Sequence, residues 1–468
     1  MAGLVTPNCS GPYVPGRTAA RAQATDPPMT ADQVLALAPD PASAKAGRGL
    51  ASPRKWAAAG TDGTLLWGEC QGSGSTPYQT RVELATVAYK CSCPSRKFPC
   101  KHVLGLLLLH AAGGASSGAP PDWASAWLAE RASKAEKSAA AATKSPSRSA
   151  DSAANAAAAA KRAKAREDRV AAGIAECELW LRDVVRLGLA HAQTQPSRYW
   201  YDRAARLVDA QCPGVARRVR GLAWIVASGA GWEGRLLAAL GEIALLCSAQ
   251  RRLDDLPLPL RADVRRHVGW NQTYDEIVAR AFDVVEDTWT VTGIRTEEDE
   301  RLTLRRTWLR GERSARDALI VQFAPAGAPI ADPFVAGIDV DAKVVYLESA
   351  SPLRAVVAER GGFSGGAVVP RASGFDDALA GYARALAGDP WLERFPFVLR
   401  EVTPLRSGDT WFARDADGRA LPLARNLREP FALHALAGGR PLTLAAEWDG
   451  RALLPLGAWS DARYTALA

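Results

Sequence analysis

The residues best suited to chemistry in this sequence are three cysteines and one histidine, crowded into residues 91–102. They lie in the stretch CSCPSRKFPCKH and are Cys91, Cys93, Cys100 and His102. The chain has 468 residues but only 8 cysteines and 5 histidines, so this clustering stands out. Thiolates and neutral imidazoles are the ligands that structural zinc prefers, four at a time in a tetrahedron. The spacing therefore predicts one structural zinc ion bound by these four side chains.

Two short elements would have to position these ligands. In an extended strand, residues i and i+2 point to the same side, which suits the C-x-C pair. The connector PSRKFP contains two prolines and predicts a turn. The segment CKHVLGLLLLH has the length and leucine content of a helix, so Cys100 and His102 would lie at a helix N-terminus, where free backbone N–H groups favour a thiolate. The ion would join a strand end to a helix start, and four protein ligands would leave no position for a reactive water.

An alternative interpretation is that these residues are buried cysteines and a surface histidine without a metal. The remaining cysteines and histidines show no comparable clustering. Cys70, on the predicted strand TLLWGEC, is expected to be a small buried residue and not a further ligand. Isolated positions in helical patterns predict core cysteines and helix-end, surface or capping histidines, namely Cys177, Cys212, Cys247, His110, His191 and His267.

The pattern C-x-C-x6-C-x-H resembles the SWIM zinc finger family, and the flanking segments resemble a bacterial subfamily of it. The resemblance covers residues 30–112 and is carried by VLALAPDPASAKAGRGLA, LWGECQGSGSTPYQTRVEL and KCSCPSRKFPCKHVLGLLLL. It implies zinc binding and a role in DNA or protein interaction. It also implies protein partners, since bacterial members of this kind are associated with MoxR-like AAA ATPases and von Willebrand factor A proteins.

Basic residues surround the predicted metal site. Arg96 and Lys97 lie on the connector beside Phe98, and Lys101 begins the predicted helix. Such a tip would contact nucleic-acid phosphates and stack an aromatic ring on a base. The other interpretation is a solvated loop whose Phe98 packs over the zinc site. The net charge of +8 and the pI of about 9.1 are compatible with an acidic partner but do not identify one.

Composition and periodicity divide the chain into five segments of an α+β multidomain protein. Residues 1–28 are expected to form a disordered tail, and Met29, just before the family-like block, is a candidate natural start. Residues 29–112 form a small α/β module around the zinc. Residues 113–162 form an alanine-rich basic linker whose middle is expected to be disordered, with a Ser-Pro break at Ser145. A basic run begins at the end of this linker with Lys161 and Arg162 and continues into the next segment with Lys164 and Arg166.

The two large segments that follow differ in hydrophobic period. Residues 163–285 show helical spacing of apolar residues, as in IAECELWLRDVVRLGLAHA, and predict an all-α domain. Residues 286–468 predict a β-rich domain, because DTWTVTGI, ALIVQFA and AKVVYLES alternate with a period of two. A helix near residues 375–386 interrupts the strands. An OB-type barrel is one architecture that this segment allows.

The one enzyme-like string is GFSGG at residues 362–366, which matches G-x-S-x-G with Ser364 as the nucleophile. A nucleophile of this kind needs a strand before it and a helix directly after it, whereas AVVPRASG follows here. No phosphate-binding P-loop or credible dinucleotide fingerprint is present in the sequence. We therefore predict a non-enzymatic zinc-binding adaptor, with a serine hydrolase using Ser364 as the alternative.

Hydropathy and the first residues bear on location. No run of 18 apolar residues occurs, so we expect no membrane partner. The start MAGLVTPNCSGPYVPGR lacks the basic residues and apolar core of a secretory signal. Cysteines in metal-type spacing agree with a reducing compartment. Together these features predict a cytoplasmic protein of bacterial type.

Overall fold

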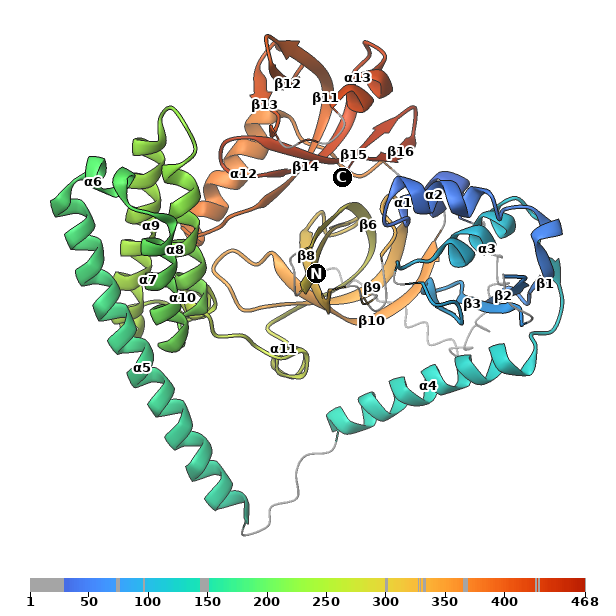
Figure 1. The fold of residues 1–468 in the computed structure, drawn as a ribbon, viewed down its shortest axis with the longest axis horizontal. Helices are drawn as coiled ribbons and strands as arrows, with labels where there is room; N and C mark the ends of the chain where they lie inside the picture. The colour runs from blue at the N-terminus through green and yellow to red at the C-terminus, as the bar shows by residue number, and fades with distance from the viewer. Residues whose placement is uncertain are drawn as a thin grey trace, which may run out of the picture.

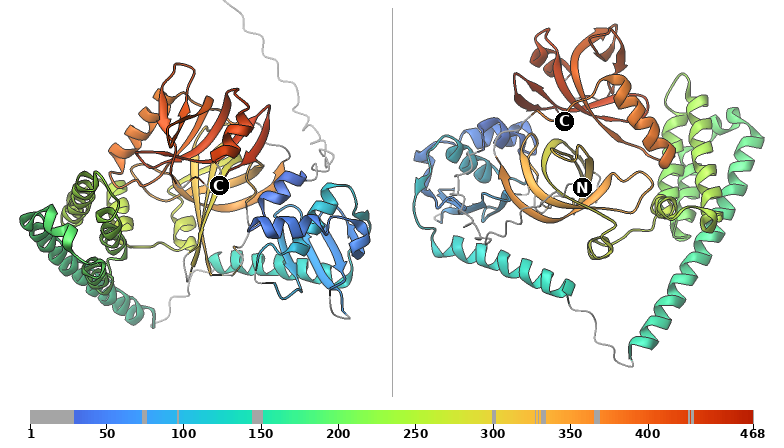
Figure 2. Two further views of the ribbon diagram at one scale, coloured as in Figure 1. Left: turned by 45° about the horizontal axis from the view of Figure 1, so that its top comes forward. Right: turned by 180° about the vertical axis from the view of Figure 1, so that it is seen from behind.

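The structure is a computed structural model that describes residues 29–72, 76–95, 97–143, 151–298, 302–326, 328, 330, 334–364, 369–425, 427 and 430–467. The tail expected at residues 1–28, Arg96 and Ser145 lie outside these residues. The described chain forms an N-terminal module, a helical bundle, a small barrel and a C-terminal sheet, which confirms the predicted α+β multidomain class (Figure 1). The bundle and the N-terminal module lie on opposite sides of the barrel (Figures 1 and 2).

The N-terminal module is a five-stranded sheet covered by helices. The sheet has the order β4-β3-β2-β1-β5 and comprises β1 (Trp56–Thr61), β2 (Leu65–Cys70), β3 (Tyr78–Glu83), β4 (Ala88–Cys91) and β5 (Ser116–Ser117). The helices are α1 (Ala31–Ala36), α2 (Pro41–Arg48) and α3 (Lys101–Ala111). Helix α3 is apolar on all sides, and the side chains from Val103 to Leu109 are buried. A Cβ on Gly47 of α2 would lie 2.7 Å from the Cβ of Leu104, so glycine allows α2 and α3 to pack closely.

Within the described residues, two helices span most of the segment that the sequence predicts to be an alanine-rich linker. Helix α4 (Asp122–Thr143) packs its first turns on the module, where Ala124 and Trp127 share a small core with Leu65 and Trp67. Helix α5 (Asp151–Leu187) then runs into the bundle. Alanine has the highest helix propensity of all residues, so an alanine-rich segment forms helix even where few tertiary contacts support it.

The predicted all-α region corresponds to a bundle of helices and to the short helix α11 (Tyr274–Arg280) that follows it. The bundle comprises α5, α6 (Leu189–Thr194), α7 (Ser197–Asp209), α8 (Pro213–Val226), α9 (Trp232–Arg251) and α10 (Leu258–Val268). Its core contains Trp180, Trp200 and Trp232 together with the buried Cys177, Cys212 and Cys247. Among the described helices, none combines the length and hydropathy that crossing a bilayer requires.

The barrel has the strand order of an OB-type fold. Its strands are β6 (Asp283–Glu298), β7 (Leu302–Gly311), β8 (Asp317–Pro325), β9 (Asp339–Tyr346) and β10 (Arg354–Ser364). They close in the order β10-β8-β7-β6-β9, with β8 and β10 parallel and the other pairs antiparallel. A five-stranded barrel in which the third and fifth strands are the parallel neighbours is the arrangement that the sequence allowed but could not establish.

The C-terminal sheet packs on the barrel. It has the order β13-β12-β11-β14-β15-β16 and comprises β11 (Phe395–Ser407), β12 (Thr410–Arg414), β13 (Ala420–Pro422), β14 (Leu442–Trp448), β15 (Leu453–Ser460) and β16 (Arg463–Ala466), flanked by α12 (Phe375–Gly388) and α13 (Pro430–Ala437). Glu447 is buried and accepts hydrogen bonds from Arg306 at 3.0 and 3.2 Å and from the indole of Trp308 at 2.9 Å. This face of β7 is therefore occupied by the protein's own sheet.

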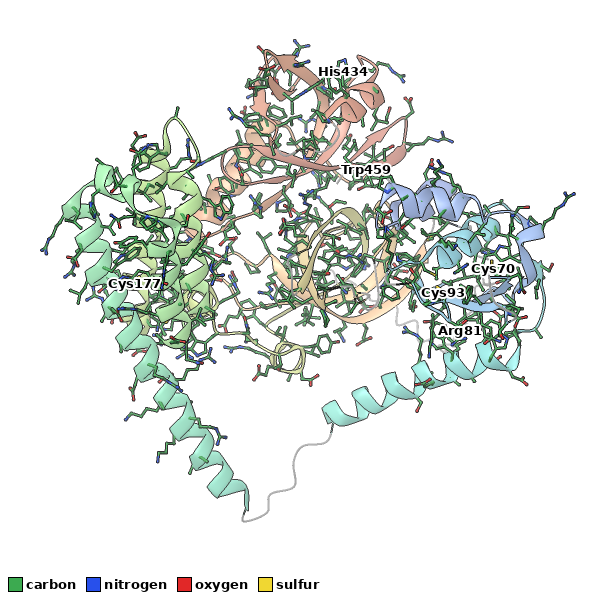
Figure 3. The ribbon with its side chains drawn as sticks, in the orientation of Figure 1. Cys70, Arg81, Cys93, Cys177, His434 and Trp459 are labelled. Atoms are coloured by element: carbon green, nitrogen blue, oxygen red, sulfur yellow. The ribbon has the colours of Figure 1, made fainter. Side chains whose placement is uncertain are left out.

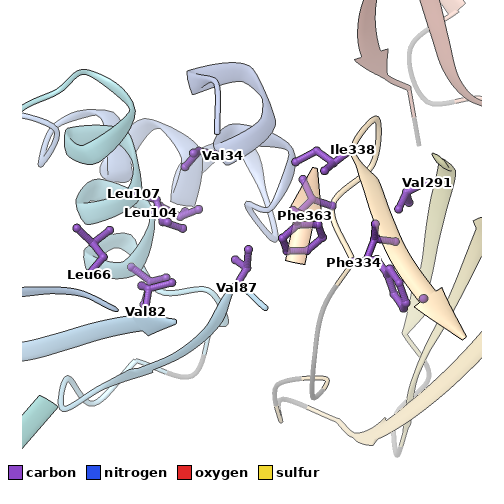
Figure 4. Packing of buried hydrophobic residues seen from close by; sticks show 14 of the residues in the cluster. Val34, Leu66, Val82, Val87, Leu104, Leu107, Val291, Phe334, Ile338 and Phe363 are labelled. Atoms are coloured by element: carbon purple, nitrogen blue, oxygen red, sulfur yellow. The ribbon is translucent and has the colours of Figure 1, made fainter. Parts of the chain in front are cut away.

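The N-terminal module shares one hydrophobic core with the barrel. Val34, Val87 and Leu104 on the module side belong to the same buried cluster as Ile338 and Phe363 on the barrel side (Figure 4). Tyr89 on β4 lies close to Arg305 on β7, and burial raises the pKa of the tyrosine to about 12. More than 200 residues of sequence separate some of these contacts, so the barrel holds the module in place through long-range packing.

Candidate metal centre

The predicted ligands lie where a strand ends and a helix starts. Cys91 is the last residue of β4, Cys93 follows two residues later, Cys100 is the N-cap residue of α3, and His102 lies in the first turn of α3. Antiparallel pairing with β3 places Cys91 opposite Thr80. The two pairs thus come from the end of β4 and the start of α3, and their ligand atoms converge on one point.

The geometry of these four residues suits a tetrahedral zinc ion. One ligand atom from each of them, a cysteine Sγ or a ring nitrogen of His102, lies within 4.8 Å of all the others. The Nδ1 atom of His102 is 3.8 Å from Sγ of Cys91 and 4.0 Å from Sγ of Cys100. Zn–S bonds near ~2.3 Å and Zn–N bonds near ~2.0 Å give ligand–ligand edges of about 3.5–3.8 Å. The donor set and its spacing therefore fit the ion, and the cluster supports one structural zinc.

The local environment favours a negative charge at Cys91. Contact with the Cys100 thiol lowers the pKa of Cys91 most, followed by contacts with His102 and Thr80, and brings it to about 3 against the opposing effect of burial. The Thr80 hydroxyl lies 3.2 Å from Sγ of Cys91 and can donate a hydrogen bond to the thiolate. Contact with the Cys91 thiolate and burial raise the pKa of Cys100, and burial raises that of Cys93. Cys91 is therefore the thiol that ionises first, and a bound cation would lower the pKa of the other two.

Two residues that support the cluster are not recognisable from the ligand motif. Thr80 faces Cys91, and the ring of Tyr78 packs against His102 with a centroid distance of 5.0 Å. Both side chains lie on the same face of β3, because residues two apart in a strand point to the same side. The period-two pattern of YQTRVE predicts a strand with Tyr78 and Thr80 on one face. The register between β3 and β4 is also needed to place these two residues beside the ligands.

A pocket opens directly beside the cluster. It has a volume of about 560 Å³ and lies between α2, the end of β2 and the segment that carries the ligands. Its lining residues are Ala42, Ser43, Ala46, Leu50, Cys70, Gln71, Gly72, Tyr78, Cys93, Pro94, Ser95, Lys97, Lys101 and His102. Two of these are lysines, Lys97 and Lys101, and two are members of the cluster, Cys93 and His102, so a ligand in this pocket would lie next to the metal site and within reach of these lysines.

The basic residues expected to contact nucleic acid have different surroundings. Lys97 forms an ion pair with Asp40 of 2.7 Å, and this contact lowers the pKa of Asp40 to about 2. Lys101 is exposed at the start of α3, whereas Arg96 lies outside the described residues. Phe98 has 37% of its surface exposed, so the ring is only partly packed.

The other cysteines lie apart from the cluster. Cys70 is 2% exposed and lines the pocket, but it is not one of the four residues that converge (Figure 3). Burial raises its pKa, which is the behaviour of a core thiol. Cys177 lies far from the module, within the bundle (Figure 3). Among the described cysteines none forms a disulfide.

In the residues that the structure describes, the surroundings of the hydrolase motif do not include the helix of a nucleophile elbow. Ser364 is the last residue of β10, which supplies the preceding strand. The next described residues, 369 and 370, are irregular, and α12 begins only at Phe375. A nucleophile elbow has its helix directly after the serine. The barrel strands around it are mainly antiparallel, unlike the parallel sheet of an α/β-hydrolase.

One histidine has a role that differs from the expectation of a surface or capping residue. The Nε2 atom of His267 on α10 lies 2.9 Å from each carboxylate oxygen of the buried Asp389, which follows α12. Arg266 lies 3.4 Å from the same carboxylate, and Trp391 inserts into the bundle core. His267 therefore helps to join the bundle to the C-terminal sheet region. Its partner lies 122 residues away along the chain, which is why the sequence around it gave no signal.

Comparison with known protein families agrees with this arrangement. Residues 78–111 match the model of the SWIM zinc finger, and residues 165–268 match that of the SWIM-associated four-helix bundle domain. The first match contains all four members of the cluster, and the second covers most of the bundle from α5 to α10. No match to the chain was found among curated proteins or among solved structures.

Proposed function

Because the chain carries a SWIM zinc finger and a SWIM-associated bundle, we propose that it is a non-enzymatic adaptor that binds its partners beside the metal site. SWIM zinc fingers are in general non-catalytic interaction modules. One observation carries the proposal: the pocket of about 560 Å³ is bounded by two members of the Cys3His cluster and by two lysines. Lys97 is already paired with Asp40, so Lys101, which is exposed at the edge of this recess, is the lysine that would meet a negatively charged group on a partner.

The zinc would have a structural role in this function. Cys91, Cys93, Cys100 and His102 would hold the ion, which supplies the link between the end of β4 and the start of α3. Four protein ligands complete a tetrahedral shell, so activation of water is not expected. The cluster instead fixes the position of Lys101, which lies between Cys100 and His102, and of Lys97, which lies three residues before Cys100. These lysines, with Arg96, are the residues that we propose for contacts with nucleic-acid phosphates.

A protein partner is our first candidate and nucleic acid the second. The resemblance to the bacterial subfamily suggests a MoxR-like AAA ATPase or a von Willebrand factor A protein. We place this activity in the cytoplasm, where the free thiols of the described cysteines would stay reduced. On the barrel, the face of β7 that OB folds commonly use for oligonucleotides is occupied at Arg306 and Trp308 by Glu447. The finger is therefore the better candidate for a nucleic-acid contact.

A pull-down from the native cell, with and without nuclease, tests the adaptor function. We expect a protein partner to be retained after nuclease treatment by the wild type. A variant with Lys97→Glu and Lys101→Glu should lose it, because both substitutions reverse the charge of the pocket. A partner that disappears with nuclease would instead show that nucleic acid bridges the two proteins. Equal retention by the wild type and the double variant would show that this pocket is not the binding surface.

The proposal that the protein is not an enzyme has its own test. p-Nitrophenyl esters of short and medium chain length should be hydrolysed no faster by the purified protein than by buffer. Ser364→Ala is the variant that isolates the alternative hydrolase, since it removes only the hydroxyl of the GFSGG motif. Turnover by the wild type that is lost in Ser364→Ala would establish the hydrolase function in place of a purely non-catalytic role.

A further inference from the structure

A groove runs along the surface of the bundle between α5 and α9, far from the finger. It has a volume of about 460 Å³ and is lined by Glu178, Leu181, Arg182, Val185 and Arg186 on α5 and by Leu237, Leu240, Gly241 and Ala244 on α9. On α5, Leu181 and Val185 are one helical turn apart. On α9, Leu240 and Gly241 each lie about one turn after Leu237. Val185 and Leu237 are each 56% exposed, so the apolar lining is open to solvent.

The floor of the groove is open at Gly241, in the interior of α9. A Cβ built on this residue would meet no atom within 4 Å. The packing of the bundle therefore does not require glycine at this position. Gly221 and Gly234 are open in the same way, whereas Gly214 is required by packing, since a Cβ on Gly214 would lie 2.1 Å from the carbonyl oxygen of His267. Glycine in a helix interior costs about 1 kcal/mol relative to alanine, and here its effect is to leave the groove unfilled.

The charges at the rim are mainly positive. Glu178 forms an ion pair of 3.0 Å with Arg251, so its charge is already compensated. Arg182 and Arg186 are exposed and lie four residues apart on one side of α5. Across the part of the chain that the structure describes, no carboxylate lies within ion-pair distance of either arginine. The groove thus combines an apolar floor with two uncompensated guanidinium groups.

We propose that this groove binds an acidic amphipathic helix of a partner protein. Leucine-type side chains at positions i, i+3 or i+4, and i+7 of that helix would occupy the floor above Gly241, as in other helix-in-groove complexes. Carboxylates on the neighbouring positions would pair with Arg182 and Arg186, for which the guanidinium fork is well suited. The observation behind this choice of occupant is charge complementarity. The inference concerns a second surface and does not depend on the finger.

Two designed peptides of 18 residues test this proposal with the full, zinc-loaded chain. Both carry leucines with the i, i+3, i+4, i+7 spacing, and one has glutamate where its twin has lysine on the flanking positions. Fluorescence anisotropy measures their binding. We expect the acidic peptide to bind at least tenfold more tightly than the lysine twin. Failure of the wild type to bind the acidic peptide, or equal binding of the two, would overturn the proposal.

Matched glycine variants locate the binding site. Gly241→Leu fills the groove, and we expect it to weaken binding of the acidic peptide at least tenfold. Gly221→Leu is the control, because Gly221 on α8 also has open space around it but does not line the groove. Both variants should keep the circular dichroism of the wild type. If they bind the acidic peptide equally well, the peptide binds elsewhere and the proposal is wrong.

The double variant Arg182→Glu/Arg186→Glu tests the charge component. It should reverse the preference of the protein, so that the lysine twin binds more tightly than the acidic peptide. An unchanged preference for the acidic peptide would contradict the assignment of these arginines as its partners.

Discussion

The three thiols of the metal centre are not equivalent, although the motif presents them alike. Cys91 has the lowest pKa because the Cys100 thiol, His102 and Thr80 surround it. The sequence predicted which residues gather, since their spacing is characteristic of a zinc finger. It could not predict this ranking, because Thr80 comes into contact only through the pairing of β3 with β4.

The first prediction concerns metal content. The wild type should bind one zinc per chain, and Cys100→Ser should lose it, because a structural site depends on all of its thiolates. Cys70→Ser is the matched control, since Cys70 is a buried cysteine beside the cluster but outside it. Elemental analysis of the purified proteins is the measurement. A Cys70→Ser variant that also loses its zinc, or a wild type with two tightly bound ions, would contradict the assignment.

The second prediction concerns the basic residues that would contact nucleic acid. If the finger binds DNA, alanine at Arg96, Lys97 and Lys101 should weaken binding and lower the salt slope by roughly three, about one per phosphate contact. The control variant carries alanine at Lys161, Arg162 and Lys164 of α5. It spares Arg166, whose guanidinium packs on Trp270 and contributes to the bundle. Fluorescence anisotropy of a labelled duplex at several salt concentrations measures the DNA affinity of both variants. A loss restricted to the control variant would assign the affinity to α5.

At the scale of elements, the sequence predicted those with a strong intrinsic pattern. The predicted strand TLLWGEC corresponds to β2, and the helical spacing of residues 163–285 corresponds to the helices from α5 to α11. Strand β1 was missed, because WAAAGT has low strand propensity and becomes a strand through its pairing with β2. The OB-type order of β6–β10 depends on pairings between distant segments, which hydrophobic period alone does not specify.

The third prediction concerns the junction between α10 and the C-terminal sheet region. Asp389→Asn should lower the free energy of unfolding by about 1–3 kcal/mol, because His267 and Arg266 lose a buried acceptor. Burial alone would raise the pKa of Asp389, but the contacts with His267, with Arg266 and with the backbone N–H of Trp391 together hold the pKa below its usual value. Asp417→Asn at an exposed turn is the control.

The pH dependence of this difference follows from the lowered pKa. A carboxylate whose pKa is depressed by folding contributes stability above its unfolded pKa of about 3.9, and this contribution disappears as the pH falls toward the folded value. The gap between the wild type and Asp389→Asn should therefore shrink as the pH falls below about 5. Denaturant unfolding followed by tryptophan fluorescence measures it. A gap that widens at acid pH would show that the carboxylate is not stabilised in its charged form.

For the whole molecule, the central feature is the core that the finger shares with the barrel. Phe363 and Ile338 pack in the same cluster as Val34 and Val87, so the finger is not an appendage on a linker (Figure 4). The domain boundaries drawn from the sequence followed composition along the chain. Contacts between residues this far apart in sequence are determined by the tertiary fold and leave little trace in local composition.

The fourth prediction tests this coupling. Cys91→Ser should increase hydrogen exchange in the finger and also at the barrel residues that contact it, near Ile338 and Phe363, since they lose packing partners. Helices α7–α9 should exchange as in the wild type, because their core is a separate cluster. Peptide-level exchange measured by mass spectrometry reads out all three regions in one experiment. Unchanged exchange in the barrel would mean that the shared core survives without the metal, and increased exchange in α7–α9 would mean that the bundle depends on the finger.

The placement of the finger and the bundle on opposite sides of the barrel has a consequence for avidity (Figures 1 and 2). The pocket beside the metal site and the groove between α5 and α9 belong to regions that packing holds at a fixed separation. A partner with two binding motifs gains from both only if the linker between its motifs spans this separation. Where it does, the second contact becomes intramolecular, and the overall affinity can exceed that of either motif by roughly 10²–10⁴. The barrel, which lies between the two surfaces, would thus determine how long the linker of a bivalent partner must be.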